Sequence, residues 1–153
     1  MALEDREFVF DGSPKWSADY AIRAAAHKGL RPADVEEVHR DLKTSLGLAP
    51  QWWIIDRLTT LATMFTLARQ APDPRQLALW LSETARMLGD IPHDILAHSV
   101  DEAIRSCRHG FMPSVGEIRS HAEPLIAKRR EQTERLTIML AAWRGGHDCQ
   151  ASH

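Results

Sequence analysis

The stretch FMPSVGEI at 111–118 constrains the fold more than any other part of the chain. Gly110, just before it, can end a helix because glycine accepts the left-handed conformation of a C-terminal cap. Pro113 prevents that helix from continuing. Ser114 and Glu117 have the spacing of a capping box, in which each side chain bonds the backbone amide of the other residue. The stretch therefore predicts the end of one helix, an apolar corner and the start of the next helix.

Proline and glycine divide the rest of the chain into further helices. Helix starts are expected at Ser13-Pro14, Pro32, Pro50, Asp73-Pro74 and Pro92, and helix ends at Gly29, Gly47, Gly89 and Gly110. The segment from Pro50 to Gln70 is apolar over most of its circumference, which is typical of a central helix. Short connections favour antiparallel neighbours. We therefore expect an all-α protein: a compact bundle of short antiparallel helices with an additional C-terminal helix.

The C-terminal third is expected to form a separate helix. Pro124 lies inside a helical pattern and should kink or break it, which leaves a helix from Leu125 to Trp143. A length of 153 residues suits one domain with an appended arm. We expect an irregular N-terminal arm at 1–12, a helical bundle domain at 13–123, a basic amphipathic helix at 124–144 and a flexible tail at 145–153.

Composition and motifs argue against several classes of protein. Two cysteines form neither a disulfide framework nor a zinc ligand set, so a reducing cytoplasm is expected. The charged start predicts no signal peptide, and no apolar run approaches the roughly 20 residues of a membrane span. Phosphate-binding loops, nucleophile elbows and metal-binding helix motifs are absent from the sequence. We therefore expect no catalytic residues, no cofactor and no metal.

Charge is distributed unevenly along the chain. Between Arg105 and Arg144 there are eight cations and four anions, a net charge of +4, so the rest carries −6 of the total of −2. A positive segment on an acidic body indicates an acidic partner or a phosphate backbone. The alternative is a solvated helix face with Glu/Arg pairs at helical spacing, such as Glu131 with Arg135. Candidate phosphate contacts are Arg105, Arg108 and Arg119.

About half of the chain, from Trp53 to Pro124, carries a series of short motifs separated by helical segments. These motifs are Leu79-Trp80-Leu81, Ile91-Pro92, Ala103-Ile104-Arg105, Phe111-Met112-Pro113-Ser114 and Glu117-Ile118-Arg119. In this order they resemble the small helical domain of phage replicative-helicase loader and inhibitor proteins and their relatives in bacterial genomes. The resemblance implies a helical domain that recruits or restrains a ring helicase without catalysis, in a bacterial host cell, and that binds through a mobile C-terminal part. The chain differs from this pattern by a helical C-terminal segment and by some 50 additional N-terminal residues.

Three functions are compatible with these observations. The first is an interaction protein of DNA replication whose partner is a replicative helicase, with candidate partner-binding residues Lys128, Arg129, Arg130, Leu136, Leu140 and Trp143. The apolar members of this set could instead pack on the bundle or form a homodimer. The second function is a small nucleic-acid-binding regulator that uses the basic C-terminal third on DNA. The third, supported only by scattered histidines and carboxylates, is an enzyme of unknown type.

Overall fold

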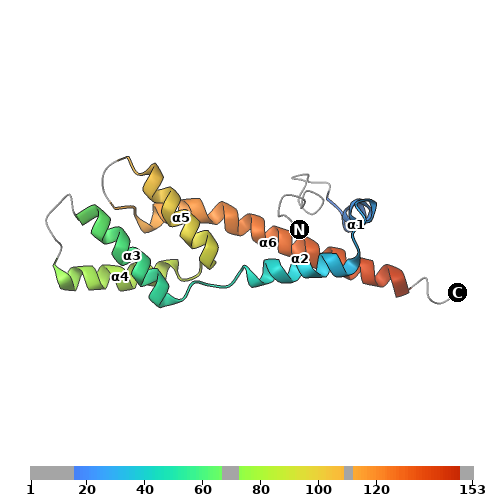
Figure 1. The fold of residues 1–153 in the computed structure, drawn as a ribbon, viewed down its shortest axis with the longest axis horizontal. Helices are drawn as coiled ribbons and strands as arrows, with labels where there is room; N and C mark the ends of the chain where they lie inside the picture. The colour runs from blue at the N-terminus through green and yellow to red at the C-terminus, as the bar shows by residue number, and fades with distance from the viewer. Residues whose placement is uncertain (1–15, 67–72, 109–111, 149–153) are drawn as a thin grey trace. The chain divides into compact units, whose positions relative to one another are not determined.

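A computed structural model describes residues 16–66, 73–108 and 112–148. In these ranges the chain forms six helices and no strand, which confirms the all-α fold class (Figure 1). The helices are α1 (Ala18–His27), α2 (Pro32–Thr44), α3 (Gln51–Thr66), α4 (Pro74–Leu88), α5 (His93–Ser106) and α6 (Val115–Asp148). The predicted arm at 1–12, the Ser13-Pro14 start, the Gly110-Phe111 part of the corner and the last five residues lie outside the described ranges.

The chain divides into two compact units. Unit 1 comprises Met1–Thr44 and Lys128–His153, and unit 2 comprises Ser45–Ala127. Helix α6 contributes its first part to unit 2 and its second part to unit 1. Each unit has a hydrophobic core of its own.

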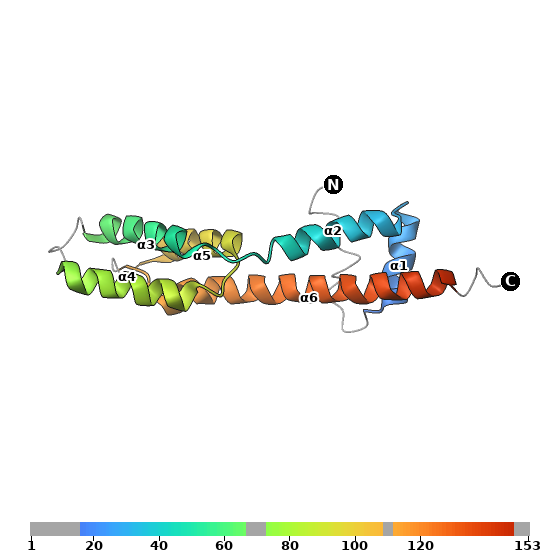
Figure 2. The same cartoon turned by 90° about the horizontal axis from the view of Figure 1, so that it is seen from below.

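Unit 1 is built from α1, α2 and the second part of α6. Figures 1 and 2 show α2 beside that part of α6, with α1 crossing it. The turn after α1 depends on Gly29, whose φ of 74° is accessible to glycine at low cost. The amide of Gly29 donates to the carbonyl of Ala26, and the amide of Leu30 to that of Ala25, which is the Schellman arrangement. This cap allows α2 to start immediately after the turn.

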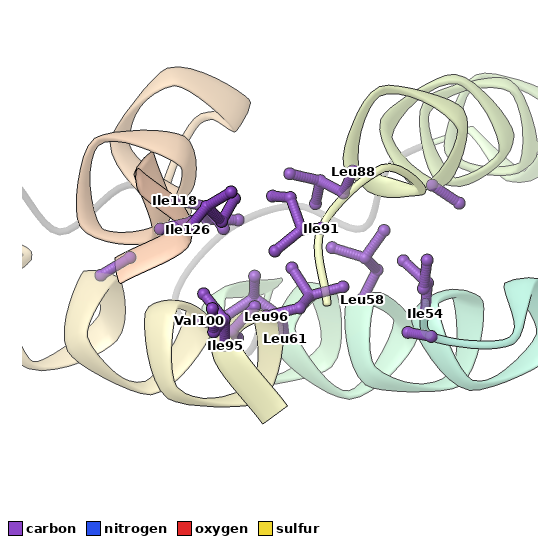
Figure 3. Packing of buried hydrophobic residues seen from close by; sticks show 14 residues of the cluster. Ile54, Leu58, Leu61, Leu88, Ile91, Ile95, Leu96, Val100, Ile118 and Ile126 are labelled. Atoms are coloured by element: carbon purple, nitrogen blue, oxygen red, sulfur yellow. The ribbon is translucent and has the colours of Figure 1, made fainter. Parts of the chain in front are cut away.

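Unit 2 packs α3, α4, α5 and the first part of α6 around one core. Figure 3 shows side chains of this core, which come from all four helices and from the α4–α5 connection and point toward one another. Its fully buried members include Leu58, Leu88, Ile91 and Ile118. At its edge, the amide of His93 donates to the carbonyl of Gly47 at 3.0 Å, which joins the segment before α3 to the start of α5.

The capping box at the start of α6 is confirmed. The Ser114 amide donates to Oε2 of Glu117 at 2.7 Å, and the Glu117 amide donates to Oγ of Ser114 at 3.2 Å. Beside it, Pro113 is fully buried. The start of α6 is therefore held by reciprocal bonds that satisfy otherwise unpaired backbone groups.

Replacing Ser114 by Ala is expected to lower the free energy of unfolding by about 0.5–2 kcal/mol, because the N-terminal turn of α6 loses its side-chain acceptor. Urea unfolding followed by circular dichroism measures this change. Ser120→Ala is the matched control, since Ser120 also lies in α6 and is exposed, but its hydroxyl bonds only a carbonyl within the helix. Equal stability of the two variants would show that the capping box contributes nothing.

Four details of the sequence-based expectation are wrong. Helix α6 continues through Pro124 instead of breaking there, and it extends to Asp148, so residues 145–148 are helical rather than part of a tail. Helix α1 begins at Ala18 with Ser17 as its cap, because the Ser17 hydroxyl accepts from the Tyr20 amide. Helix α2 ends at Thr44 rather than near Gly47. Helix α3 supplies Ile54, Leu58 and Leu61 to the core of unit 2, as expected of a central helix, although Trp52 at its start is 70% exposed.

Candidate functional site

Unit 1 contains a groove between α2 and α6 with a volume of about 450 Å³. Volumes of this size are typical of sites that hold a ligand or a few side chains of a partner. The residues that line it come from two turns of each helix: Glu36, His39, Arg40, Lys43, Thr137, Leu140, Ala141 and Arg144. Leu140 and Ala141 supply apolar surface, and the polar residues lie around them.

Positive charge predominates around the groove. Arg40, Lys43 and Arg144 are cationic, and Glu36 is the one acidic residue among the lining residues, so the lining carries a net charge of +2 with His39 neutral. The guanidinium of Arg144 donates to Oε1 of Glu36, and this bond joins α6 to α2 along the groove. The exposed Arg40 and Lys43 lie one turn apart on α2. An anionic partner would therefore meet two exposed cations from α2.

His39 joins the two helices at the groove. Its Nε2 lies 2.9 Å from Oγ1 of Thr137, at hydrogen-bond distance. Burial lowers the pKa of His39 below its ordinary value near 6.5, and the charge of Lys43 lowers this pKa further. The neutral imidazole is thus the form that the folded unit favours.

Stability is expected to decrease as the pH falls from 7.5 to 5, in part because of His39. A histidine whose pKa is lower in the folded than in the unfolded state stabilises the fold above pH 6.5, and this contribution is lost as the pH falls through the folded-state pKa. Protonation would also place a new charge beside Lys43, Arg40 and Arg144. Thermal unfolding at several pH values measures the effect. His39→Gln keeps a donor for Thr137 but cannot titrate, so its midpoint should fall less than that of the wild type between pH 7.5 and 5. An identical fall in both proteins would contradict the role given to His39.

The apolar residues predicted to bind a partner lie in the core of unit 1. Leu136, Leu140 and Trp143 are 0%, 6% and 9% exposed and pack with residues of α1 and α2. Leu136 and Trp143 do not reach a partner while unit 1 is folded, and Leu140 exposes only a small surface, within the groove. The sequence left open whether these residues bind a partner, form a dimer face or pack within the protein. The structure shows them packed within unit 1, and the other two uses receive no support.

The basic residues singled out from the sequence do not form one cluster of unpaired cations. Arg119 donates to both carboxylate oxygens of Asp90, at 2.7 and 3.0 Å, and to the carbonyl of Met87. The hydrogen bond with Asp90 raises the pKa of Arg119, so its charge is retained. Arg105 donates to Glu102 within α5, whereas Arg108 is exposed just beyond α5. Arg119 therefore joins α6 to the end of α4 and has a structural role.

The basic run at 128–130 lies at the beginning of the unit 1 part of α6. Lys128 and Arg130 are exposed, and Arg129 is half-buried. None of the three lines the groove. The groove residues on α2 were not predicted as a site, and the signal that could have indicated them is the three-residue spacing of Arg40 and Lys43 on the polar face of a helix.

Unit 2 exposes several large apolar side chains that are not part of its core. Trp52 on α3 and Leu79 on α4 are 70% and 65% exposed, and Leu48, just before α3, is 58% exposed. Next to Trp52, the Trp53 ring meets the ring of His93 edge-on at 4.3 Å and packs against the core. Tryptophan is enriched among the residues that dominate binding energy at protein interfaces. Trp52 is therefore a candidate contact for a protein partner.

Comparisons with protein-family models, with curated proteins and with solved structures returned no significant match. Within the described residues, no helix combines the length and the apolar character needed to cross a membrane. The same residues contain no group of three or more His, Cys, Asp or Glu side chains that could hold a metal ion.

Proposed function

We propose that this protein is a non-catalytic interaction protein of phage-type DNA replication, which recruits or inhibits a replicative helicase in the cytoplasm of a bacterial host cell. The proposal rests on the position of the motif series that runs from Leu79 to Arg119. The described residues of this series fall within unit 2, which has its own core. Separate motifs meet there: Ile91 and Ile118 are both fully buried in the same core. The arrangement supports reading the series as one domain rather than as scattered matches.

The helicase would contact unit 2 through its exposed apolar residues. Trp52 and Leu79 lie on α3 and α4, two helices that pack on each other, and both side chains are more than half exposed. Exposed apolar side chains gain free energy when a partner removes them from water. We therefore propose that the helicase contacts α3 and α4 of unit 2 rather than Leu136, Leu140 and Trp143 of α6.

Binding of the purified full-length protein to the host replicative helicase tests this proposal. Trp52→Ala and Leu79→Ala should each weaken binding by about tenfold or more, as expected for central interface residues. Ile138→Ala is the matched control, because Ile138 is 46% exposed but lies in unit 1; it should leave the affinity within about twofold of the wild type. Absence of a complex, or equal losses in all three variants, would overturn the proposal.

The alternative, a small nucleic-acid-binding regulator, is less well supported. It requires cations that can meet phosphates, and Arg105 and Arg119 already bind carboxylates within the protein. It predicts binding to DNA that weakens steeply as salt is raised. Titration of a labelled DNA duplex at two salt concentrations separates it from the helicase proposal.

A further inference from the structure

The groove of unit 1 has two properties that together specify a class of ligand. Part of its surface is apolar, from Leu140 and Ala141, and cations of α2 lie beside that surface. Leu140 lines the groove and is 6% exposed, so the surface that it offers there is small. A ligand that fills this groove gains most when an apolar group covers Leu140 and a negative charge faces α2.

The arrangement of the charges favours a protein partner over a nucleic acid. Arg40 and Lys43 are exposed on α2, where charges steer an acidic partner and fix its orientation. Glu36 occupies the same groove and would repel a continuous phosphate backbone. An acidic peptide can place its carboxylates on the α2 side and avoid Glu36, whereas phosphates repeat along every nucleotide.

The polar groups between the helices are already paired. His39 bonds Thr137 across the groove, and Glu36 bonds Arg144. These bonds keep α2 and α6 at a fixed separation without a ligand. The groove is therefore preformed, and a peptide could bind it without first opening the unit.

We propose that the groove between α2 and α6 is a docking site for an acidic peptide segment of a partner protein, with an apolar side chain over Leu140 and carboxylates facing Arg40 and Lys43. The site lies in unit 1, so it does not depend on the helicase contact proposed for unit 2. The protein would then carry two binding surfaces of different chemistry, one in each unit.

Fluorescence polarisation with the full-length protein tests this proposal. The probe is a labelled peptide of about twelve residues that contains only Glu and Leu in an amphipathic helical pattern. Arg40→Glu and Lys43→Glu should each weaken its binding by about tenfold or more. Arg23→Glu reverses an exposed charge on α1 of the same unit, outside the groove, and should change binding less than about twofold. Circular dichroism verifies that each variant keeps its helices.

Two further probes identify the chemistry that the groove recognises. A peptide with Ser in place of each Leu should bind at least about tenfold more weakly, because it cannot cover Leu140. A labelled single-stranded oligonucleotide should not compete with the Glu/Leu peptide. Equal binding of the two peptides, unchanged binding by the Arg40 and Lys43 variants, or displacement by the oligonucleotide would each overturn the proposal. So would a mass of twice 17.3 kDa by light scattering that Lys43→Glu restores to 17.3 kDa, since a second copy would then occupy the groove.

Discussion

Leu136→Ala is expected to lower the free energy of unfolding of unit 1 by about 2–5 kcal/mol, since a buried leucine replaced by alanine loses its transfer free energy and leaves a cavity. Leu136 is 0% exposed and packs in the core that α1, α2 and α6 form together. A loss of this size is a large fraction of the total stability of a typical domain, about 5–15 kcal/mol. Chemical denaturation followed by circular dichroism measures it as a lower transition midpoint.

The control for this variant is Ile138→Ala, two residues further along the same helix. Ile138 is 46% exposed, so its replacement should change stability by no more than about 0.5 kcal/mol. If both variants were equally stable, Leu136 would not be a core residue. It would then be available as an anchor for a partner, which is the alternative that the sequence allowed.

The second large effect is expected for Leu88→Ala in unit 2, with a loss of about 2–5 kcal/mol for the same physical reason. Leu88 is the last residue of α4, is 0% exposed and points into the core shown in Figure 3. The adjacent Met87 is 45% exposed, and Arg119 bonds only its backbone carbonyl, so Met87→Ala keeps that bond. Denaturant unfolding of the two variants side by side should separate them by more than about 1.5 kcal/mol. Coincident unfolding curves would mean that the end of α4 is not anchored in the core.

The parts of the fold that follow from local chemistry were predictable from the sequence. Asp73 caps α4 as expected, with its carboxylate accepting from the Arg75 amide, and the predicted Gly89 is the C-cap that follows Leu88. The Ser114–Glu117 box was predictable for the same reason. Each of these signals acts within one turn of chain and needs no knowledge of the tertiary structure.

The course of α6 through Pro124 could not be predicted from local rules. Proline removes one backbone hydrogen bond, so the sequence favours an interruption. On either side of it, Ala122 is fully buried and Ile126 is 8% exposed in the core of unit 2. Burial of residues before and after Pro124 stabilises a continuous helix, and this packing involves residues far away in the sequence.

The candidate site was less predictable than the fold. Helical spacing identified the apolar stripe of Leu136, Leu140 and Trp143, but the spacing does not reveal which residues pack on this stripe. Here α1 and α2 cover it, from about 100 residues earlier in the chain. Likewise, the count of basic residues could not reveal that Arg119 pairs with Asp90, because that pairing depends on how α6 meets the end of α4. The α2–α6 groove arises only from the packing of the two helices, and local sequence patterns give little indication of it.

The partner proposed for this protein is a replicative helicase. This proposal is tested by recovering the tagged protein from the cells that express it. Mass spectrometry and nuclease treatment then identify what accompanies the protein. We expect the replicative helicase to be the principal protein recovered, and raised salt and nuclease should not remove it. Recovery of DNA that is lost as salt is raised, without the helicase, would overturn the helicase proposal and favour a nucleic-acid-binding regulator.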